Sequence, residues 1–203
     1  MGRDAGDSSV DEASLIAAAQ QGRIDAFNDL VLAYQHQVYN LAYRILGDPA
    51  SAADATQETF ISAYHHIAEF RGGSFRSYLL RIAANACYDE LRRRQRRPAT
   101  SLEDWDVDEE ANPTLVNGSE GPEEHAERKE VARVIQACIE ALPADQRMTL
   151  VLSDVEGLSY EEIAETTDVA LGTVKSRLAR ARGRLRDCLR AHGELLPAGY
   201  RLE

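Results

Sequence analysis

The sequence has few aromatic residues and no long hydrophobic run. Aromatic side chains make up 6% of the 203 residues, with one tryptophan, so leucine, isoleucine, valine and alanine must fill the interior. No segment approaches the roughly 18 consecutive apolar residues of a membrane-spanning helix. The opening segment, MGRDAGDSSVDEAS, is acidic and rich in small residues, which is the pattern of neither a secretion signal nor a myristoylation site.

Cysteine is also scarce. Cys87, Cys138 and Cys188 are odd in number and far apart in the sequence, and no two of them have the spacing of metal ligands. We therefore expect three reduced, packed thiols in a cytoplasmic protein, and keep a redox or metal-binding role as the alternative. The five histidines form no ligand pattern either, so no metal and no other cofactor is expected.

Signatures of enzymes are missing as well. The sequence has no glycine-rich phosphate-binding loop and no nucleophile in a recognisable turn. Its basic segments have no carboxylate cluster beside them, which a metal-dependent nuclease would need. We expect a protein that is not an enzyme.

The charge is unevenly distributed. The formal net charge is −11, from 23 basic and 34 acidic residues. Residues 76–97 nevertheless carry seven arginines against two acids, a net +5, and residues 171–190 carry seven basic residues against one acid, a net +6. Residues 101–130 carry eleven acids against two bases, a net −9. Two separate basic surfaces on an acidic chain favour contact with one nucleic acid at two places.

Apolar residues recur every three or four positions in the first half, which predicts helices. We expect a short helix over residues 11–21, a second from about 24 to a stop at 47–49, a third from about 50 to 70 and a fourth from 74 to 97. Residues 11–97 would form a helical domain after a disordered segment over 1–10. The residues expected to face inward are Ile24, Phe27, Leu30, Val31, Tyr34, Val38, Leu41, Ile45, Leu46, Ala53, Phe60, Ile61, Tyr64, Ile67, Phe75, Tyr78, Leu79, Ile82, Ala83, Ala86 and Leu91.

Residues 98–122 interrupt the helical periodicity with three prolines, two glycines and six acids before Ala111. This composition cannot form a core and predicts a flexible acidic linker. Periodicity resumes over 123–192, with a tail over 193–203. The expected fold class is all-α, with two small helical domains.

The second domain has the pattern of a helix-turn-helix. Ser159 and Glu162 form a predicted capping box at the start of a short helix. The turn falls at Thr167-Asp168, where aspartate tolerates the left-handed conformation. A strongly basic helix follows from about Leu171.

This last helix suits duplex DNA, because a major groove admits one helix and long cationic side chains reach phosphates and guanine edges. A merely solvated helix face is the alternative, but such faces usually mix charges of both signs. The residues on or near the polar face are Lys175, Ser176, Ala179, Arg180 and Arg182, opposite Val174, Leu178, Ala181 and Leu185.

The earlier basic segment, FRGGSFRSYLLRIAANACYDELRRRQRR, suits single-stranded DNA. Gly72 and Gly73 would let a strand approach the backbone, and Asn85 offers both a donor and an acceptor to a base edge. The arginines would follow the strand's phosphates. Alternatively, Phe75 and Tyr78 belong to the core, and the arginine run is a solubilising helix end.

These segments resemble the extracytoplasmic-function sigma factors, the small two-domain class of the sigma-70 family of bacterial transcription initiation factors. The resemblance covers about residues 12–97 and 123–190. It is carried by four segments in order: ADATQETFISAYHHIAEFRG, FRSYLLRIAANACYDELRRR, LPADQRMTLVLSDVEGLSYEEIAE and GTVKSRLARARGRLR.

The resemblance implies three sets of site residues and places residues 144–155 at the polymerase flap. Contact with the −10 promoter element falls to Arg71, Gly72, Gly73, Ser74, Phe75, Arg81, Asn85, Arg92 and Arg93. Contact with the −35 element falls to Thr173, Lys175, Ser176, Ala179, Arg180 and Arg182. Binding to the clamp helices of core RNA polymerase falls to Asp54, Gln57, Glu58 and Phe60.

The implied function is that of an alternative sigma factor. Such a protein binds core RNA polymerase in the bacterial cytoplasm, recognises both promoter elements, promotes DNA melting and is held inactive by an anti-sigma factor. The main alternative is a stand-alone helix-turn-helix regulator. That alternative leaves the FRGG loop, Asn85 and the arginine run unexplained.

Overall fold

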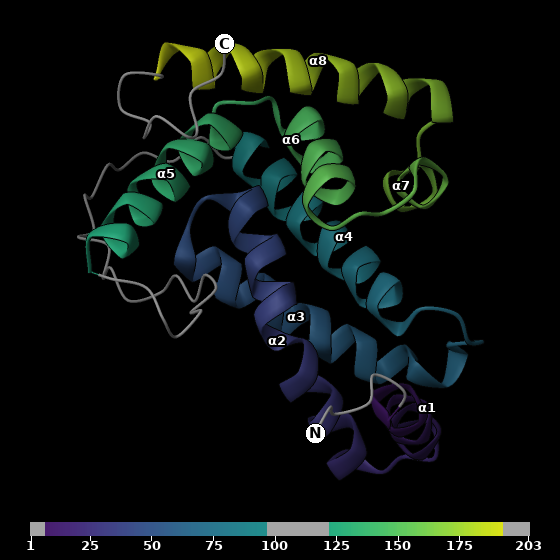
Figure 1. Ribbon diagram of the computed structural model, residues 1–203. Coiled ribbons are helices and arrows are strands. Elements are labelled where there is room, and N and C mark those ends of the chain that lie inside the picture. The colour runs from purple at the N-terminus through teal and green to yellow at the C-terminus, as the bar shows by residue number, and fades with distance from the viewer. Residues whose placement is uncertain (1–6, 97–121, 193–203) are drawn as a thin grey trace.

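The computed structural model describes residues 7–96 and 122–192, and no strand occurs among them (Figure 1). The predicted all-α class is confirmed. Most of the predicted acidic linker, residues 1–6 and residues 193–203 lie outside the described residues. The prediction of disorder is wrong for residues 7–10, which form the first turn of a helix. The helices are α1 (Asp7–Gln20), α2 (Ile24–Leu46), α3 (Pro49–His66), α4 (Phe75–Arg96), α5 (Pro122–Glu140), α6 (Ala144–Leu150), α7 (Tyr160–Thr167) and α8 (Leu171–Ala191), with a 3₁₀ turn η1 (Ile67–Glu69) and a π-helical turn η2 (Val151–Val155).

Local signals set the break between α2 and α3. Gly47 adopts a left-handed conformation (φ 73°), and its N–H donates to the carbonyl of Tyr43, which ends α2. Asp48 then accepts a hydrogen bond from the backbone N–H of Ser51 at 2.7 Å, and Pro49 opens α3. The predicted stop at residues 47–49 is confirmed.

Helix α3 faces the core with small side chains. Ala52, Ala55, Thr59 and Ala63 are buried at helical spacing. This stripe lets α2 and α4 pack closely against α3. The predicted burial of Phe60 and Ile67 is confirmed. The prediction is wrong for Ala53, which is exposed, and for Ile61, which is 51% exposed. Ile24, also expected inside, is 60% exposed at the first residue of α2.

The helices form two units, α1–α4 over residues 7–96 and α5–α8 over residues 122–192. The second unit contains the predicted helix-turn-helix. The Ser159 side chain accepts from the Glu162 N–H at 3.2 Å, and the Glu162 carboxylate accepts from the Ser159 N–H at 2.9 Å, so the predicted capping box is present. Asp168 takes the left-handed conformation at φ 49° and ends α7. Helix α8 starts at Leu171 as expected, with Val174, Leu178 and Ala181 buried.

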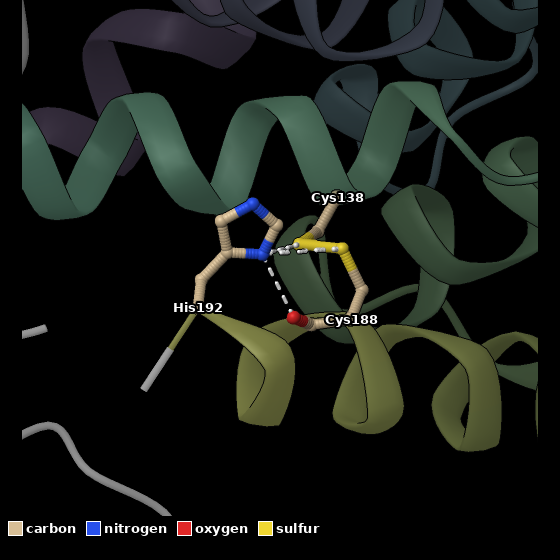
Figure 2. The surroundings of a disulfide bond; sticks show 3 residues. All are labelled: Cys138, Cys188 and His192. Atoms are coloured by element: carbon tan, nitrogen blue, oxygen red, sulfur yellow. Dashed lines mark hydrogen bonds between the residues drawn. A yellow bond between two sulfur atoms is a disulfide. The ribbon is translucent and has the colours of Figure 1, made fainter. Parts of the chain in front are cut away.

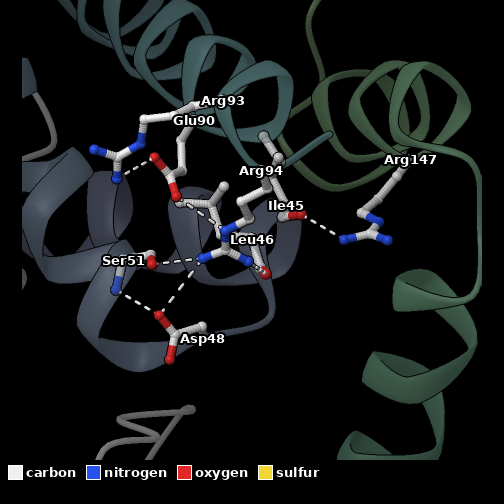
Figure 3. Close-up of polar contacts among 8 residues, drawn as sticks. All are labelled: Ile45, Leu46, Asp48, Ser51, Glu90, Arg93, Arg94 and Arg147. Atoms are coloured by element: carbon white, nitrogen blue, oxygen red, sulfur yellow. Dashed lines mark hydrogen bonds and ion pairs between the residues drawn. The ribbon is translucent and has the colours of Figure 1, made fainter. Parts of the chain in front are cut away.

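The two helical units pack against each other and share a continuous hydrophobic core. Arg147 at the end of α6 donates to the carbonyl of Ile45 at 2.7 Å (Figure 3), and Gln136 on α5 donates to the carbonyl of Tyr43 at 3.3 Å. Burial is the main cause that lowers the pKa of Arg147. In Figure 1, α4, the last helix of the first unit, lies between the rest of that unit and helices α6 and α7. No pattern in the sequence predicted this packing.

A buried carboxylate links the units at a second place. Glu156 follows η2, and its side chain is 6% exposed. Its Oε2 accepts from Arg76 at 2.7 Å and from Gln37 at 3.0 Å. Burial of this charge is therefore compensated by donors from two helices of the other unit.

Two of the three cysteines are joined. Cys138 on α5 and Cys188 on α8 form a disulfide (Figure 2), while Cys87 is free and buried on α4. The expectation of three reduced thiols is therefore wrong for Cys138 and Cys188, which lie 50 residues apart in the sequence. No helix in the described ranges is long and apolar enough to cross a membrane.

Candidate nucleic-acid interface

The polar face of α8, where the sequence predicts contact with DNA and which we call the reading face, is open to solvent. Lys175, Ser176, Ala179 and Arg180 are exposed, and Thr173 is half-buried at the start of the face. Arg180 donates to the carbonyl and hydroxyl oxygens of Ser176, each at 3.1 Å, so its guanidinium lies back along the helix. This face presents cationic and small polar groups to one side, as the sequence predicted.

Arg182 and Arg177 are engaged within the protein. Arg182 donates to both carboxylate oxygens of Asp154, at 2.8 and 2.6 Å. This bidentate contact is the first cause that lowers the pKa of Asp154. Arg177 pairs with Asp145 at 3.0 Å. Both arginines tie α8 to the preceding elements α6 and η2, so the guanidinium of Arg182 is already occupied by Asp154.

The loop before α4 is exposed and backbone-accessible. Gly72 and Gly73 have φ values of 98° and 90°, and a side-chain carbon added at either would meet no atom within 4 Å. Ser74 accepts from the N–H of Ser77 at 3.1 Å and caps α4. Arg71 and Ser74 are both exposed. The loop thus leaves room for a ligand beside its backbone.

Phe75 does not belong to this exposed surface. Its side chain is 1% exposed and packs against Tyr34, Phe70 and Tyr78. The assignment of Phe75 to −10 contact is therefore corrected: it is a core residue that supports the loop. Since α4 begins at Phe75, the first side chain of the helix anchors it.

The remaining residues of this surface lie along α4. Arg81 and Asn85 are exposed one helical turn apart. Arg92 lies over the Tyr88 ring at 5.6 Å from the ring centre, a cation–π arrangement. Arg93 is exposed and pairs with Glu90 at 2.6 Å. Arg81 and Asn85 thus lie on the same exposed side of α4, and their contact with a DNA strand stays a prediction.

Arg94 departs from the predicted run of strand-facing arginines. It donates to Glu90 at 2.9 Å, to the hydroxyl of Ser51 at 2.5 Å and to the carbonyl of Leu46 at 3.1 Å (Figure 3). It therefore holds the α2–α3 junction onto α4.

A cavity of about 400 Å³ lies between the loop and α7. Arg71, Tyr78 and Arg81 line one side, and Glu162 and Glu165 line the other. The Tyr78 hydroxyl is buried with no hydrogen-bond partner among the described residues, and burial raises its pKa. Hydrogen bonds with Ser159 are the largest cause that lowers the pKa of Glu162. Acidic side chains of α7 thus face the loop across this cavity.

The predicted polymerase surface on α3 is partly exposed. Asp54, Gln57 and Glu58 point to solvent, and Asp54 and Glu58 line a groove of about 300 Å³ between α3 and α4. Phe60 is only 9% exposed and belongs to the core. Its assignment to direct polymerase contact is corrected to a supporting role.

Both halves of the chain match one family. Residues 30–97 match Sigma-70 region 2, and residues 132–185 match Sigma-70 region 4. The RNA polymerase sigma-H factor of Pseudomonas aeruginosa is 40% identical over 172 residues, which cover 83% of this chain and 88% of that protein. The chain belongs to the extracytoplasmic-function sigma factors. The ECF RNA polymerase sigma factor SigE of Mycolicibacterium smegmatis is 38% identical over 177 residues, which cover 87% of this sigma factor and 66% of that relative.

Solved structures support the same fold. CnrH, solved with the cytosolic domain of CnrY, is similar to this sigma factor with a TM-score of 0.60 and 25% identity, covering 89% of this chain and 98% of that one. RpoE of Bartonella quintana, solved with the anti-sigma factor NepR, has a TM-score of 0.62 and 26% identity, covering 82% and 98%.

The region 2 match contains the loop, Arg81 and Asn85, and the region 4 match contains the exposed face of α8. Cys188 and His192 lie beyond the region 4 match. Sequence reasoning missed one possible ligand spacing, because Cys188 and His192 are four residues apart and so share a helix face.

Proposed function

We propose that this sigma factor reads one promoter with two separate surfaces while bound to core RNA polymerase. Helix α8 reads the −35 element as duplex, and the loop with Arg81 and Asn85 holds −10 bases as single strand. The observation that carries the proposal is the exposure of both surfaces within region 2 and region 4 matches that follow in order. Like other sigma factors it is a transcription initiation factor and not an enzyme.

The −35 step rests on helix-in-groove docking. Lys175 and Arg180 offer donors to phosphates and guanine edges, while Ala179 allows close approach of the helix. The arginines farther along α8, Arg184 and Arg186, are exposed and extend the contact to phosphates. Their contribution falls as salt rises, because phosphate contacts release counterions.

The −10 step converts base capture into DNA opening. Extruding a base costs a few kcal/mol of stacking free energy. Only a base of the unpaired strand can enter a protein pocket, where its new contacts offset that cost. Asn85 offers paired donor and acceptor groups to the base edge, and Arg81 offers charge to the phosphates. Preferential binding of the unpaired strand shifts the equilibrium toward the open promoter.

Polymerase binding uses surfaces on both units. Asp54, Gln57 and Glu58 contact the clamp helices, and α6 with η2 contacts the flap. The protein works where polymerase works, in the bacterial cytoplasm.

The packed arrangement of the two units is the inactive form of the free chain. Glu162 and Glu165 face the loop across the cavity, where they repel phosphates. Polymerase must separate the units to place each surface on DNA. Because CnrH and RpoE were solved with other proteins, an anti-sigma factor in the case of RpoE, we propose that an anti-sigma factor holds this chain inactive as well.

Co-purification with core polymerase, followed by promoter melting on a single-promoter template, tests this function. We expect one chain per core enzyme and strand opening that requires both proteins. Promoter-specific, high-affinity DNA binding by the free chain, without stoichiometric core binding, would instead identify a stand-alone regulator.

A further inference from the structure

Three side chains of types that can ligate a metal ion, Cys138, Cys188 and His192, converge where α5 meets the end of α8 (Figure 2). Cys138 is 1% exposed, while Cys188 and His192 are half-buried. Nδ1 of His192 lies 4.0 Å from the sulfur of Cys138 and 4.0 Å from that of Cys188. No other group of three such ligands occurs among the residues that the structure describes.

The donor set matches zinc once the disulfide is reduced. Two thiolates and one imidazole are common zinc ligands, with Zn–S near 2.3 Å and Zn–N near 2.0–2.1 Å. Tetrahedral geometry with these bonds puts each sulfur about 3.6 Å from the ligating nitrogen. The observed separations of 4.0 Å must shorten by a few tenths of an ångström, and the two sulfurs, which are bonded to each other in the disulfide, must move apart to about 3.8 Å. Rotation of the cysteine side chains after reduction supplies both changes.

We propose that the reduced chain binds one zinc-class divalent cation through Cys138, Cys188 and His192, with a fourth position open to water. The proposal rests on the proposed function in one respect: a factor that serves polymerase works in a reducing compartment, where dithiols persist. His192 Nδ1 lies 2.9 Å from the carbonyl of Cys188 in the disulfide form. Cation binding replaces that contact and releases the thiol protons.

The position of the site gives it a structural consequence. Apart from these side chains, a small separate apolar cluster of Val131 and Val134, with Ile135 and Leu189 against it, packs α5 against α8 near the site. The main core holds the other half of α8 through Val174, Leu178 and Ala181. The cation therefore fastens the far end of the reading helix to α5.

Oxidation empties the site. A peroxide accepts two electrons from the two thiolates: its O–O bond breaks, the S–S bond forms, and two protons convert the oxygens to two waters. The cation leaves because a disulfide offers no thiolate ligands. Both forms hold α8 to α5, but only one contains metal.

Cobalt titration of the reduced full-length chain tests the proposal. The chain is reduced with a phosphine, transferred to chelator-free buffer without oxygen and titrated with Co²⁺. We expect one Co²⁺ per chain, a sulfur-to-cobalt charge-transfer band and displacement by Zn²⁺. The peroxide-treated chain should show none of these. This measurement needs no polymerase or DNA, so its failure is separable from failure of the proposed function.

Variants assign the ligands. Cys138→Ser and Cys188→Ser should each remove most of the charge-transfer intensity, and His192→Ala should keep it while weakening affinity at least about tenfold. Cys87→Ser is the matched control and should change nothing, because Cys87 is buried on α4. In the reduced, unmodified chain, Zn²⁺ should slow alkylation of Cys188. This measurement does not depend on whether a variant folds. Absent cobalt binding, a spectrum without the sulfur band, or a band that survives Cys138→Ser would overturn the proposal.

Discussion

Replacing Glu156 by glutamine should release the two helical units from each other. The Glu156 side chain is 6% exposed and accepts from Arg76 at 2.7 Å and Gln37 at 3.0 Å. Glutamine keeps the shape but removes the charge, so the contact with Arg76 loses its ionic character. A hydrogen bond to a charged group contributes about 1.5–3 kcal/mol.

The lower end of that range applies here, because the Arg76 side chain is 36% exposed and solvent screens it. A loss of about 1.4 kcal/mol corresponds to a tenfold change in an equilibrium constant. We call the form with separated units the open form. If it is the minor form, its population rises about tenfold, and the apparent affinity for a ligand that binds only the open form rises by the same factor.

The assay is fluorescence anisotropy of a labelled single-stranded oligonucleotide carrying the −10 element, without polymerase. We expect the Glu156→Gln chain to bind about tenfold more tightly than the unmodified chain. Glu161→Gln is the matched control, since Glu161 is exposed on α7 and its replacement makes the same change in net charge. Equal gains in the two variants would show a general charge effect, and no gain for Glu156→Gln would refute the closed-state reasoning.

Four further predictions concern single side chains. Asn85→Ala should reduce promoter opening, followed by a fluorescent base, more than polymerase binding; equal losses would make Asn85 structural. Arg180→Ala should weaken −35 recognition by about 1–3 kcal/mol in competition binding, and an unchanged −35 preference would remove it from the reading face. Phe75→Ala should lower the free energy of unfolding by about 3–5 kcal/mol in urea titration, whereas a surface role predicts little change. Cys87, whose pKa burial raises to about 12, should resist iodoacetamide at pH 8 until the chain unfolds; rapid native alkylation would contradict its burial.

Elements fixed by neighbouring residues could be predicted from the sequence. Gly47 and Pro49 mark the α2–α3 break, Ser159 and Glu162 start α7, and Asp168 ends it. Each of these signals acts within four residues. The exposed face of α8 follows in the same way from the period of its buried residues.

Features that depend on packing could not be predicted in this way. The buried side of α3 is mostly alanine, with Thr59 and Phe60, so hydrophobicity indicated Phe60 correctly but also indicated Ile61, which is exposed. Periodicity predicted that Phe75 faces inward, which is confirmed, whereas the resemblance assigned the same side chain to −10 contact. An aromatic beside a loop has the same local pattern in either role.

Long-range pairings left no periodic trace. Cys138 and Cys188 are 50 residues apart, and their approach depends on how α5 crosses α8. The contact of Glu156 with Arg76 spans 80 residues, including the whole predicted linker. Both features depend on tertiary structure, which spacing rules do not contain.

Start-site mapping tests the central claim most directly. Purified chain and core polymerase would transcribe fragmented bacterial DNA, and the 5′ ends of the RNAs would be sequenced. The account predicts start sites absent with core alone, preceded by two shared elements; Arg180→Ala should relax selection at the upstream element and Asn85→Ala at the downstream one. Start sites identical to those of core alone, or selection at a single element lost equally in both variants, would contradict it.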